Sequence, residues 1–175
     1  MHFELTLPAA LANAASTWPG KPAIVEQSSV ITFGELNTRA RQMAKAFIGN
    51  GLESGDRFAI WAPNSSIWQI AALAGQLAGC VLVPLNTRYK SSEANDILTR
   101  SGCKAIFYAD SFLGNDYRAM LGDSNIPLVI DINRTGDWVA ESVSEEALQE
   151  RINLITSDSI ADVLYTSGTT GAPKG

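Results

Sequence analysis

The architecture of this chain follows from residues 57–85, which read RFAIWAPNSSIWQIAALAGQLAGCVLVPL. Arg57–Ala62 and Cys80–Pro84 are short apolar runs with the length of a buried strand. Between them, Ser65 can cap the start of a helix and Gly79 can end it. The stretch therefore predicts a strand, a helix and a second strand, the unit from which parallel sheets are built.

A membrane-spanning helix is the alternative for the same region, because no charged residue occurs from Phe58 to Thr87. Residues 67–85 approach the length that a helix needs to cross a bilayer. Polar residues and helix breakers interrupt this stretch, namely Gln69, Gly75, Gln76, Gly79 and Pro84. We therefore expect a buried core element and no transmembrane segment.

The flanking sequence continues the alternation of strand and helix. Helices are expected at residues 7–17, from the capping box of Thr32 and Glu35 to Gly49, and at 91–100, 113–121 and 144–153. Strands are expected at residues 23–26 and 30–32, which form a hairpin, and at 104–109, 127–131 and 160–165. This order predicts an α/β fold in one domain: a doubly wound, largely parallel sheet flanked by helices.

The last eleven residues, 165–175, read YTSGTTGAPKG and combine hydroxyls, glycines and one lysine without any acidic residue. Glycine lets backbone N–H groups approach a ligand closely, and successive N–H groups form an anion-binding concavity. Hydroxyls add donors, and Lys174 adds a positive charge on a flexible stem. This composition, directly after an expected strand, predicts a loop that binds a polyphosphate.

Other interpretations of this loop fit less well. A Gly/Ser/Thr-rich surface linker is the plainest one, but such linkers seldom follow directly on a buried strand, and residues 160–165 are expected to be one. The Walker loop requires four residues between its first glycine and its Gly-Lys pair, whereas Gly168 and Gly171 are three apart and Lys174 precedes Gly175. The Gly-x-Gly-x-x-Gly fingerprint of dinucleotide-binding proteins fails because position 166 is threonine.

Composition limits which kinds of binding partner and which cellular compartment are expected for this chain. A formal net charge of −5 argues against nucleic acid and against an anionic membrane surface. Cys80 and Cys103 lie near apolar runs and are expected to be reduced core thiols. With His2 as the single histidine, they cannot build a zinc site of the usual composition, so no metal ligand is assigned. The N-terminus shows no signal-peptide pattern, and a cytoplasmic location is expected.

The loop resembles the phosphate loop of the adenylate-forming, or AMP-binding, superfamily, whose usual form is Tyr-Thr-Ser-Gly-Thr-Thr-Gly-x-Pro-Lys-Gly. Residues 31–36 (ITFGEL) and 77–85 (LAGCVLVPL) resemble the superfamily too, in the expected order. Residues 84–90 and 112–117 are similar to acid–CoA ligases, in particular bacterial ligases that activate a propanoate side chain derived from steroid rings. The resemblance spans essentially the whole chain.

This resemblance implies an enzyme that uses ATP to activate a carboxylic acid as an acyl-adenylate and then transfers the acyl group to coenzyme A. The residues implied to bind the ATP phosphates are Thr166, Ser167, Gly168, Thr169, Thr170, Gly171 and Lys174. Mg²⁺ would be held mainly by ATP oxygens. No catalytic residue and no protein metal ligand is assigned within the chain.

Alternatives remain for the acceptor and for the role of the chain. The activated acid could be loaded onto a carrier-protein thiol, or the chain could be a non-catalytic nucleotide-binding or interaction module. Superfamily members are much longer, so residues 1–175 are expected to be the N-terminal part of an AMP-binding domain that is truncated at the phosphate loop (166–175). The chain is then expected to need the remainder of the same enzyme and to be inactive alone. The sequence leaves open whether the protein forms a homodimer.

Overall fold

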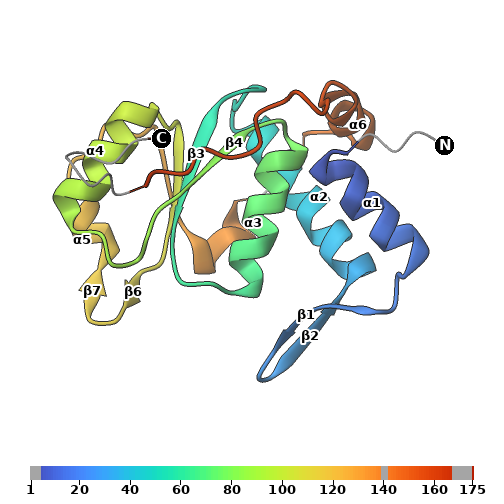
Figure 1. Cartoon of the computed structure of the whole chain (residues 1–175), viewed down its shortest axis with the longest axis horizontal. Coiled ribbons are helices and arrows are strands. Elements are labelled where there is room, and N and C mark those ends of the chain that lie inside the picture. The colour runs from blue at the N-terminus through green and yellow to red at the C-terminus, as the bar shows by residue number, and fades with distance from the viewer. Residues whose placement is uncertain (1–4, 139–141, 167–174) are drawn as a thin grey trace.

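The computed structural model describes residues 5–138, 142–166 and 175 of the chain. Its centre is a four-stranded parallel sheet with the strand order β4-β3-β5-β8 (Figure 1). The strands are β3 (Arg57–Trp61), β4 (Val81–Pro84), β5 (Ala105–Tyr108) and β8 (Leu128–Asp131). The parallel sheet confirms the prediction from the alternating pattern.

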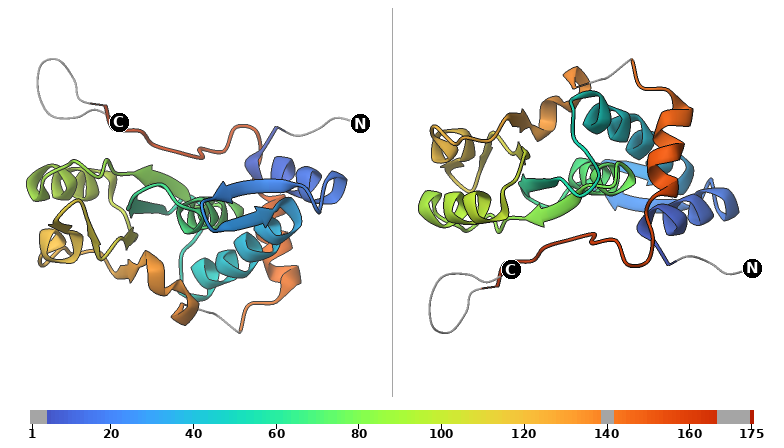
Figure 2. Two further views of the ribbon diagram at one scale, coloured as in Figure 1. Left: turned by 90° about the horizontal axis from the view of Figure 1, so that it is seen from below. Right: turned by 90° about the horizontal axis from the view of Figure 1, so that it is seen from above.

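Helices connect these strands and cover both faces of the sheet. α3 (Ser66–Leu77) joins β3 to β4, and α4 (Ser91–Ser101) joins β4 to β5. Because these crossovers step across the sheet in opposite directions, right-handed connections place α3 and α4 on opposite faces. Figure 2 shows α4 beside α5 (Tyr117–Leu121) and well separated from α2 (Phe33–Gly49). The fold is therefore doubly wound, as predicted.

An aromatic cluster fills the face covered by α2 and α3. The ring of Phe47 on α2 lies 4.9 Å from that of Phe58, 5.4 Å from that of Phe107 and 4.9 Å from that of Trp138, centroid to centroid. Gly75 brings α3 close to the same face, since a Cβ at this position would lie 2.2 Å from Cζ of Phe58. Close packing of this kind makes the helix–sheet contact intolerant of added volume.

The opposite face of the sheet is closed by α4 and α5. The fully buried ring of Trp61 packs edge-on against that of Tyr117 on α5, with centroids 4.7 Å apart. The hydroxyl of Tyr117 donates a 2.9 Å hydrogen bond to the carbonyl of Thr87. Burial on both faces explains why the central strands are continuous apolar runs in the sequence instead of alternating ones.

The N-terminal elements match their predicted positions. They are α1 (Leu7–Thr17) and an antiparallel hairpin of β1 (Pro22–Glu26) and β2 (Ser29–Thr32). The predicted capping box opens α2: the carboxylate of Glu35 accepts the Thr32 N–H at 2.8 Å, and the Thr32 hydroxyl accepts the Glu35 N–H at 3.3 Å. Glu26 accepts the backbone N–H of Ser66 at 2.7 Å and its hydroxyl at 2.9 Å, which ties the hairpin to the start of α3.

The predicted helix at residues 113–121 is wrong in its first half. The structure has a short antiparallel hairpin there, formed by β6 (Ser111–Phe112) and β7 (Asn115–Asp116). Leu113 and Gly114 have φ values of 53° and 79°, the left-handed conformation of a two-residue hairpin turn. The carboxylate of Asp116 then caps α5 through a 2.8 Å hydrogen bond from a backbone N–H of its first turn. The glycine turn and the acidic cap outweigh the helical spacing of apolar residues.

The chain after β8 passes through a 3₁₀ helix, η1 (Ile132–Asp137), and α6 (Glu145–Asn153), which Ser144 caps. It then returns along the outer side of β4 as residues 160–165, here called the edge segment (Figure 1, red). A parallel bridge between Leu82 and Asp162 confirms strand-like pairing. The expected burial is wrong, because Ile160 and Leu164 are 66% and 64% exposed.

Among the residues that the structure describes, no helix is both long and apolar enough to cross a membrane. The uncharged stretch that raised this alternative is divided, as predicted, between α3 and β4. Gly79 separates the two elements with a φ of 77°, a conformation that residues with a Cβ rarely adopt.

Candidate functional site

The edge segment places the start of the predicted phosphate loop at one end of the sheet. The N–H of Leu82 donates to the carbonyl of Ala161 at 2.9 Å, and the N–H of Val163 donates to the carbonyl of Leu82 at 2.8 Å. Because this pairing is parallel, the edge segment runs in the same direction as β4, and Thr166 follows beyond the level of Pro84, the last residue of β4. Ligands of open α/β sheets bind at these carboxyl ends of the strands.

Side chains from both faces of the sheet hold the edge segment. On one face, Nε2 of Gln76 in α3 donates a 2.9 Å hydrogen bond to Oδ1 of Asp162. On the other, the hydroxyl of Tyr89 donates to the carbonyl of Tyr165 at 3.4 Å, and the guanidinium of Arg100 in α4 lies 5.2 Å from the centre of the Tyr165 ring. The sequence prediction missed these contacts.

The described part of the chain includes one of the predicted phosphate-binding residues. Thr166 is exposed and follows the edge segment directly. The other six, Ser167, Gly168, Thr169, Thr170, Gly171 and Lys174, lie outside the described residues. The structure therefore shows where the loop begins, and the roles of its residues stay predictions.

The loop after β4 borders the same end of the sheet. The Oδ1 of Asn86 accepts the Arg88 N–H at 2.9 Å, and the Asn86 carbonyl accepts the indole N–H of Trp61 at 3.0 Å. A hollow of about 470 Å³ lies beside this loop. It is lined by Ala62, Pro63, Asn64, Trp68, Pro84, Leu85, Asn86, Thr87 and Phe112. The local hydrogen bonds of Asn86 stabilise the turn that forms one wall of this hollow.

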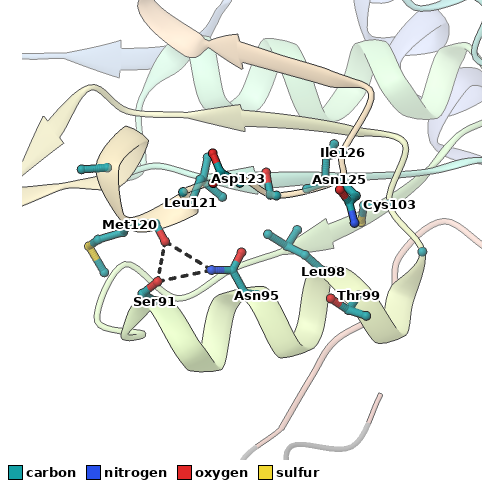
Figure 3. A pocket seen from close by; sticks show the side chains of 14 residues that line it. Ser91, Asn95, Leu98, Thr99, Cys103, Met120, Leu121, Asp123, Asn125 and Ile126 are labelled. Atoms are coloured by element: carbon teal, nitrogen blue, oxygen red, sulfur yellow. Dashed lines mark hydrogen bonds between the residues drawn. The ribbon is translucent and has the colours of Figure 1, made fainter.

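A larger hollow of about 590 Å³ lies between α4, α5 and residues 122–126 (Figure 3). Figure 3 shows Ser91 and Asn95 directed at the backbone carbonyl of Met120, and Nδ2 of Asn95 donates to that oxygen at 3.2 Å. Asp123 is the charged residue in its lining. A lining with an acidic residue and no cation is unsuited to a polyphosphate, so this hollow does not compete with the predicted loop.

Within the described residues, the cysteines and the acidic side chains form neither a metal site nor a reactive thiol site. Burial raises the pKa of Cys80 to about 12 and that of Cys103 to about 11, which keeps both as protonated, unreactive thiols. Both cysteines are buried and unpaired, which confirms the prediction that they lie in the core. No cluster of His, Cys, Asp or Glu side chains able to hold a metal ion occurs among the described residues.

Comparison with known proteins identifies the family to which this chain belongs. The family model described as AMP-binding enzyme matches residues 11–175. The chain belongs to the AMP-binding enzyme family. Its relatives include a 7a-methyl-1,5-dioxo-octahydro-inden-4-yl propanoyl:CoA ligase from Mycobacterium tuberculosis, which is 37% identical over 180 residues. A ligase of the same name from Rhodococcus jostii is 35% identical over 189 residues.

Both alignments cover 97% of this chain, and the chain spans 36% of the length of each relative. Among solved structures, an o-succinylbenzoate CoA synthetase from Bacillus subtilis in complex with AMP matches with a TM-score of 0.75 and 28% identity. That match covers 94% of this chain and 40% of the synthetase. The chain therefore has the architecture of the N-terminal region of adenylate-forming enzymes.

Proposed function

We propose that the chain is the N-terminal portion of an ATP-dependent acid–CoA ligase, ending in its phosphate loop. The intact enzyme would activate a carboxylic acid as an acyl-adenylate with release of pyrophosphate. The thiol of coenzyme A would then attack the mixed anhydride and release AMP. The two propanoyl:CoA ligases support this reaction class, and they point to a carboxylic acid attached to a fused-ring skeleton as the first substrate to test.

The observation that carries the proposal is the position of Thr166. The edge segment pairs in parallel with β4 and therefore ends at the carboxyl end of the sheet, where Thr166 follows it. The remaining residues of the predicted phosphate loop come directly after Thr166 in the sequence. During adenylation, negative charge accumulates on the departing β- and γ-phosphates, and aimed donors with a cation stabilise it. Hydroxyl and backbone N–H donors of residues 166–171 would hold these phosphates, and Lys174 would neutralise charge.

Mg²⁺ fits this donor set as an ion carried by the nucleotide. The loop supplies neutral hydroxyls and a lysine but no carboxylate, whereas Mg²⁺ prefers oxygen ligands and is usually bound through substrate phosphates. Residues 166–171 could therefore add at most a hydroxyl oxygen to its coordination shell. The ion would supply positive charge that screens the triphosphate from the incoming carboxylate.

Acid-dependent exchange of pyrophosphate into ATP tests the proposal on the full-length protein that carries this chain. Exchange should appear with one class among aliphatic, aromatic and steroid-derived acids. Consumption of coenzyme A in the presence of that acid would establish the ligase. Loading of a carrier-protein thiol instead would select the alternative acceptor. Absence of exchange with every acid would leave a non-catalytic module and refute the proposal.

The role of Lys174 gives a sharper test. Replacing it with alanine removes the positive charge next to the leaving phosphates, so Lys174→Ala should slow exchange by about 10- to 150-fold, the equivalent of about 1.5–3 kcal/mol for hydrogen bonds to charged groups. Lys104→Ala is the matched control, because Lys104 lies at the amino end of β5 and pairs with Asp56 at 2.8 Å. Unchanged exchange in Lys174→Ala would contradict the assignment.

A further inference from the structure

The hydrogen bond between Gln76 and Asp162 joins the interior of the domain to the segment that carries the phosphate loop. Gln76 is 9% exposed and lies among the buried residues of α3, whereas Asp162 lies on the exposed edge segment. The two residues are separated by 86 positions in the sequence. Because Gln76 is nearly buried, its side-chain amide is held by the core, and its hydrogen bond to Asp162 attaches the surface segment to the core.

We propose that Gln76 is a positioning residue: through Asp162 it fixes the register of the edge segment on β4, and so the place of the phosphate loop. The proposal rests on the function proposed above for that loop. Gln76 would not touch ATP. It would act by holding the strand from which the loop extends.

A side-chain contact is needed to fix the register of the edge segment because its backbone pairing with β4 is so short. Within the described residues, the edge segment meets β4 through the bridge at Asp162 and its two flanking backbone hydrogen bonds. So few backbone bonds specify register weakly, and register is usually set by which side chains are buried. Here Ile160 and Leu164 are exposed, whereas Val163 and Tyr165 are half-buried against the core, so apolar burial specifies the register through only one side of the segment.

Contacts on both faces of the sheet make a slipped register unfavourable. Asp162 is directed to α3 on one face, and Tyr165 meets Arg100 of α4 and the hydroxyl of Tyr89 on the other. Because successive side chains of a strand point to opposite faces, a slip by one residue would turn both side chains away from their partners. It would also leave the buried amide of Gln76 without its acceptor, which costs more than the bond itself contributes.

A purely structural role for Gln76 makes a different prediction. If its only function were to satisfy its own amide, Gln76→Leu would alter stability and leave the loop in place. If it positions the loop, Gln76→Leu and Asp162→Leu should each lower kcat/KM for ATP by about tenfold in the folded enzyme, the effect of losing about 1.4 kcal/mol. KM for the acid should change little, because the loop contacts the leaving phosphates.

Three further variants make the test specific. Asp162→Asn keeps an oxygen that can accept from Gln76 Nε2, so it should restore kcat/KM for ATP to near the native value. Gln69→Leu is the matched control, since it makes the same change on the exposed side of α3. The double variant Gln76→Leu/Asp162→Leu should be no worse than either single variant, because both remove one interaction.

A second readout does not depend on activity. The N–H of Val163 donates to Leu82, so its hydrogen exchange reports directly on pairing of the edge segment with β4. In the full-length protein, Gln76→Leu should speed this exchange by about tenfold or more, whereas Gln69→Leu should leave it unchanged. Native exchange rates at Val163 together with native kcat/KM for ATP in Gln76→Leu would overturn the inference.

The outcomes separate this inference from the proposed function. If the native protein shows no acid-dependent exchange of pyrophosphate into ATP, the ligase proposal fails. Hydrogen exchange at the Val163 amide still decides whether Gln76 fixes the register. If the native enzyme is active and the amide is loosened without any change in kcat/KM for ATP, the register contact exists but does not position the loop. That result would refute the inference and leave the ligase proposal standing. If Gln76→Leu fails to fold, Asp162→Leu, at an exposed position, carries the same test.

Discussion

The two edges of β4 are held by very different means. On its inner side β4 pairs with β3 through four residue pairs, from Arg57–Val81 to Ile60–Pro84, and the paired strand is buried. On its outer side, within the described residues, the bridge to Asp162 joins it to the edge segment. The same strand is thus fully paired within the buried sheet on one side and sparsely paired on the other.

This difference separates the contacts that stabilise the domain from those that we propose position the predicted phosphate loop. Phe58 and Ile60 are fully buried on the inner side, whereas Ile160 and Leu164 are mostly exposed on the outer one. Segments with few buried apolar contacts open at lower free-energy cost than the core does. Substitutions inside the sheet should therefore act on global stability, and substitutions in the edge segment should act on local opening and on function.

The largest expected contrast is between Phe47 and Leu164. Phe47 lies at the centre of the aromatic cluster, so Phe47→Ala should lower the free energy of unfolding by about 3–5 kcal/mol. Leu164 is 64% exposed, and Leu164→Ala should change the free energy by less than about 0.5 kcal/mol. Urea denaturation of the two variants measures both values. Similar losses in the two variants would show that the edge segment is part of the cooperative core.

An effect of intermediate size is expected on the alkylation rate of Cys80, the cysteine next to the edge segment. Cys80, Ile160 and Ala161 line one hollow of about 210 Å³, whereas Cys103 lies apart, with Sγ 3.2 Å from Oγ of Ser101. Both pKa values are raised by burial, to about 12 and about 11, so thiolate at pH 8 is scarce until the chain opens locally. Alkylation of each cysteine, followed by mass spectrometry, then reports opening near it.

The variant Val163→Ala removes part of the apolar contact of the edge segment with the core, worth about 1 kcal/mol for a half-buried side chain. Cys80 should then be alkylated about fivefold faster at pH 8, while the rate at Cys103 stays unchanged. Equal acceleration at both cysteines would mean that the outer edge of β4 does not open independently of the core.

The sequence predicted the inner side of β4 well because its signals are local. The strand–helix–strand pattern of residues 57–85, the Ser65 cap and the capping box of Thr32 and Glu35 each lie within a few residues of the structure they specify. The fold class follows from their alternation. The turn at Leu113 was missed because a leucine with positive φ has no signal of its own beyond the glycine that follows it.

The outer side of β4 was predicted less well because its determinants are distant. The hydrogen bond between Gln76 and Asp162 crosses 86 positions, and the contacts of Tyr165 with Tyr89 and Arg100 also join separate elements. Burial of residues 160–165 was overestimated because apolar composition predicts a strand without showing which of its sides is covered. The single polar residue Gln76 within an otherwise buried stretch of α3 was the one signal available in the sequence.

The smallest expected change in stability is at the contact between α6 and α2, away from the edge segment. Glu145 accepts Nε of Arg41 at 2.6 Å and contacts Nζ of Lys45 at 2.8 Å, but it is 52% exposed, so Glu145→Gln should cost only about 0.5 kcal/mol. Hydrogen bonding by Lys45 lowers the pKa of Glu145 from 4.5; burial opposes this shift, and Arg41 adds to it. The contribution should therefore be present above pH 4.5 and be lost as the pH falls through the lowered pKa.

Urea midpoints of Glu145→Gln and the native protein should accordingly differ at pH 7, converge at acid pH, and converge at high salt because the pair is screened. Glu150→Gln, at an exposed position of the same helix, should show none of these dependences. A difference that persists at acid pH would mean that Glu145 stabilises the contact of α6 with α2 through packing instead of charge.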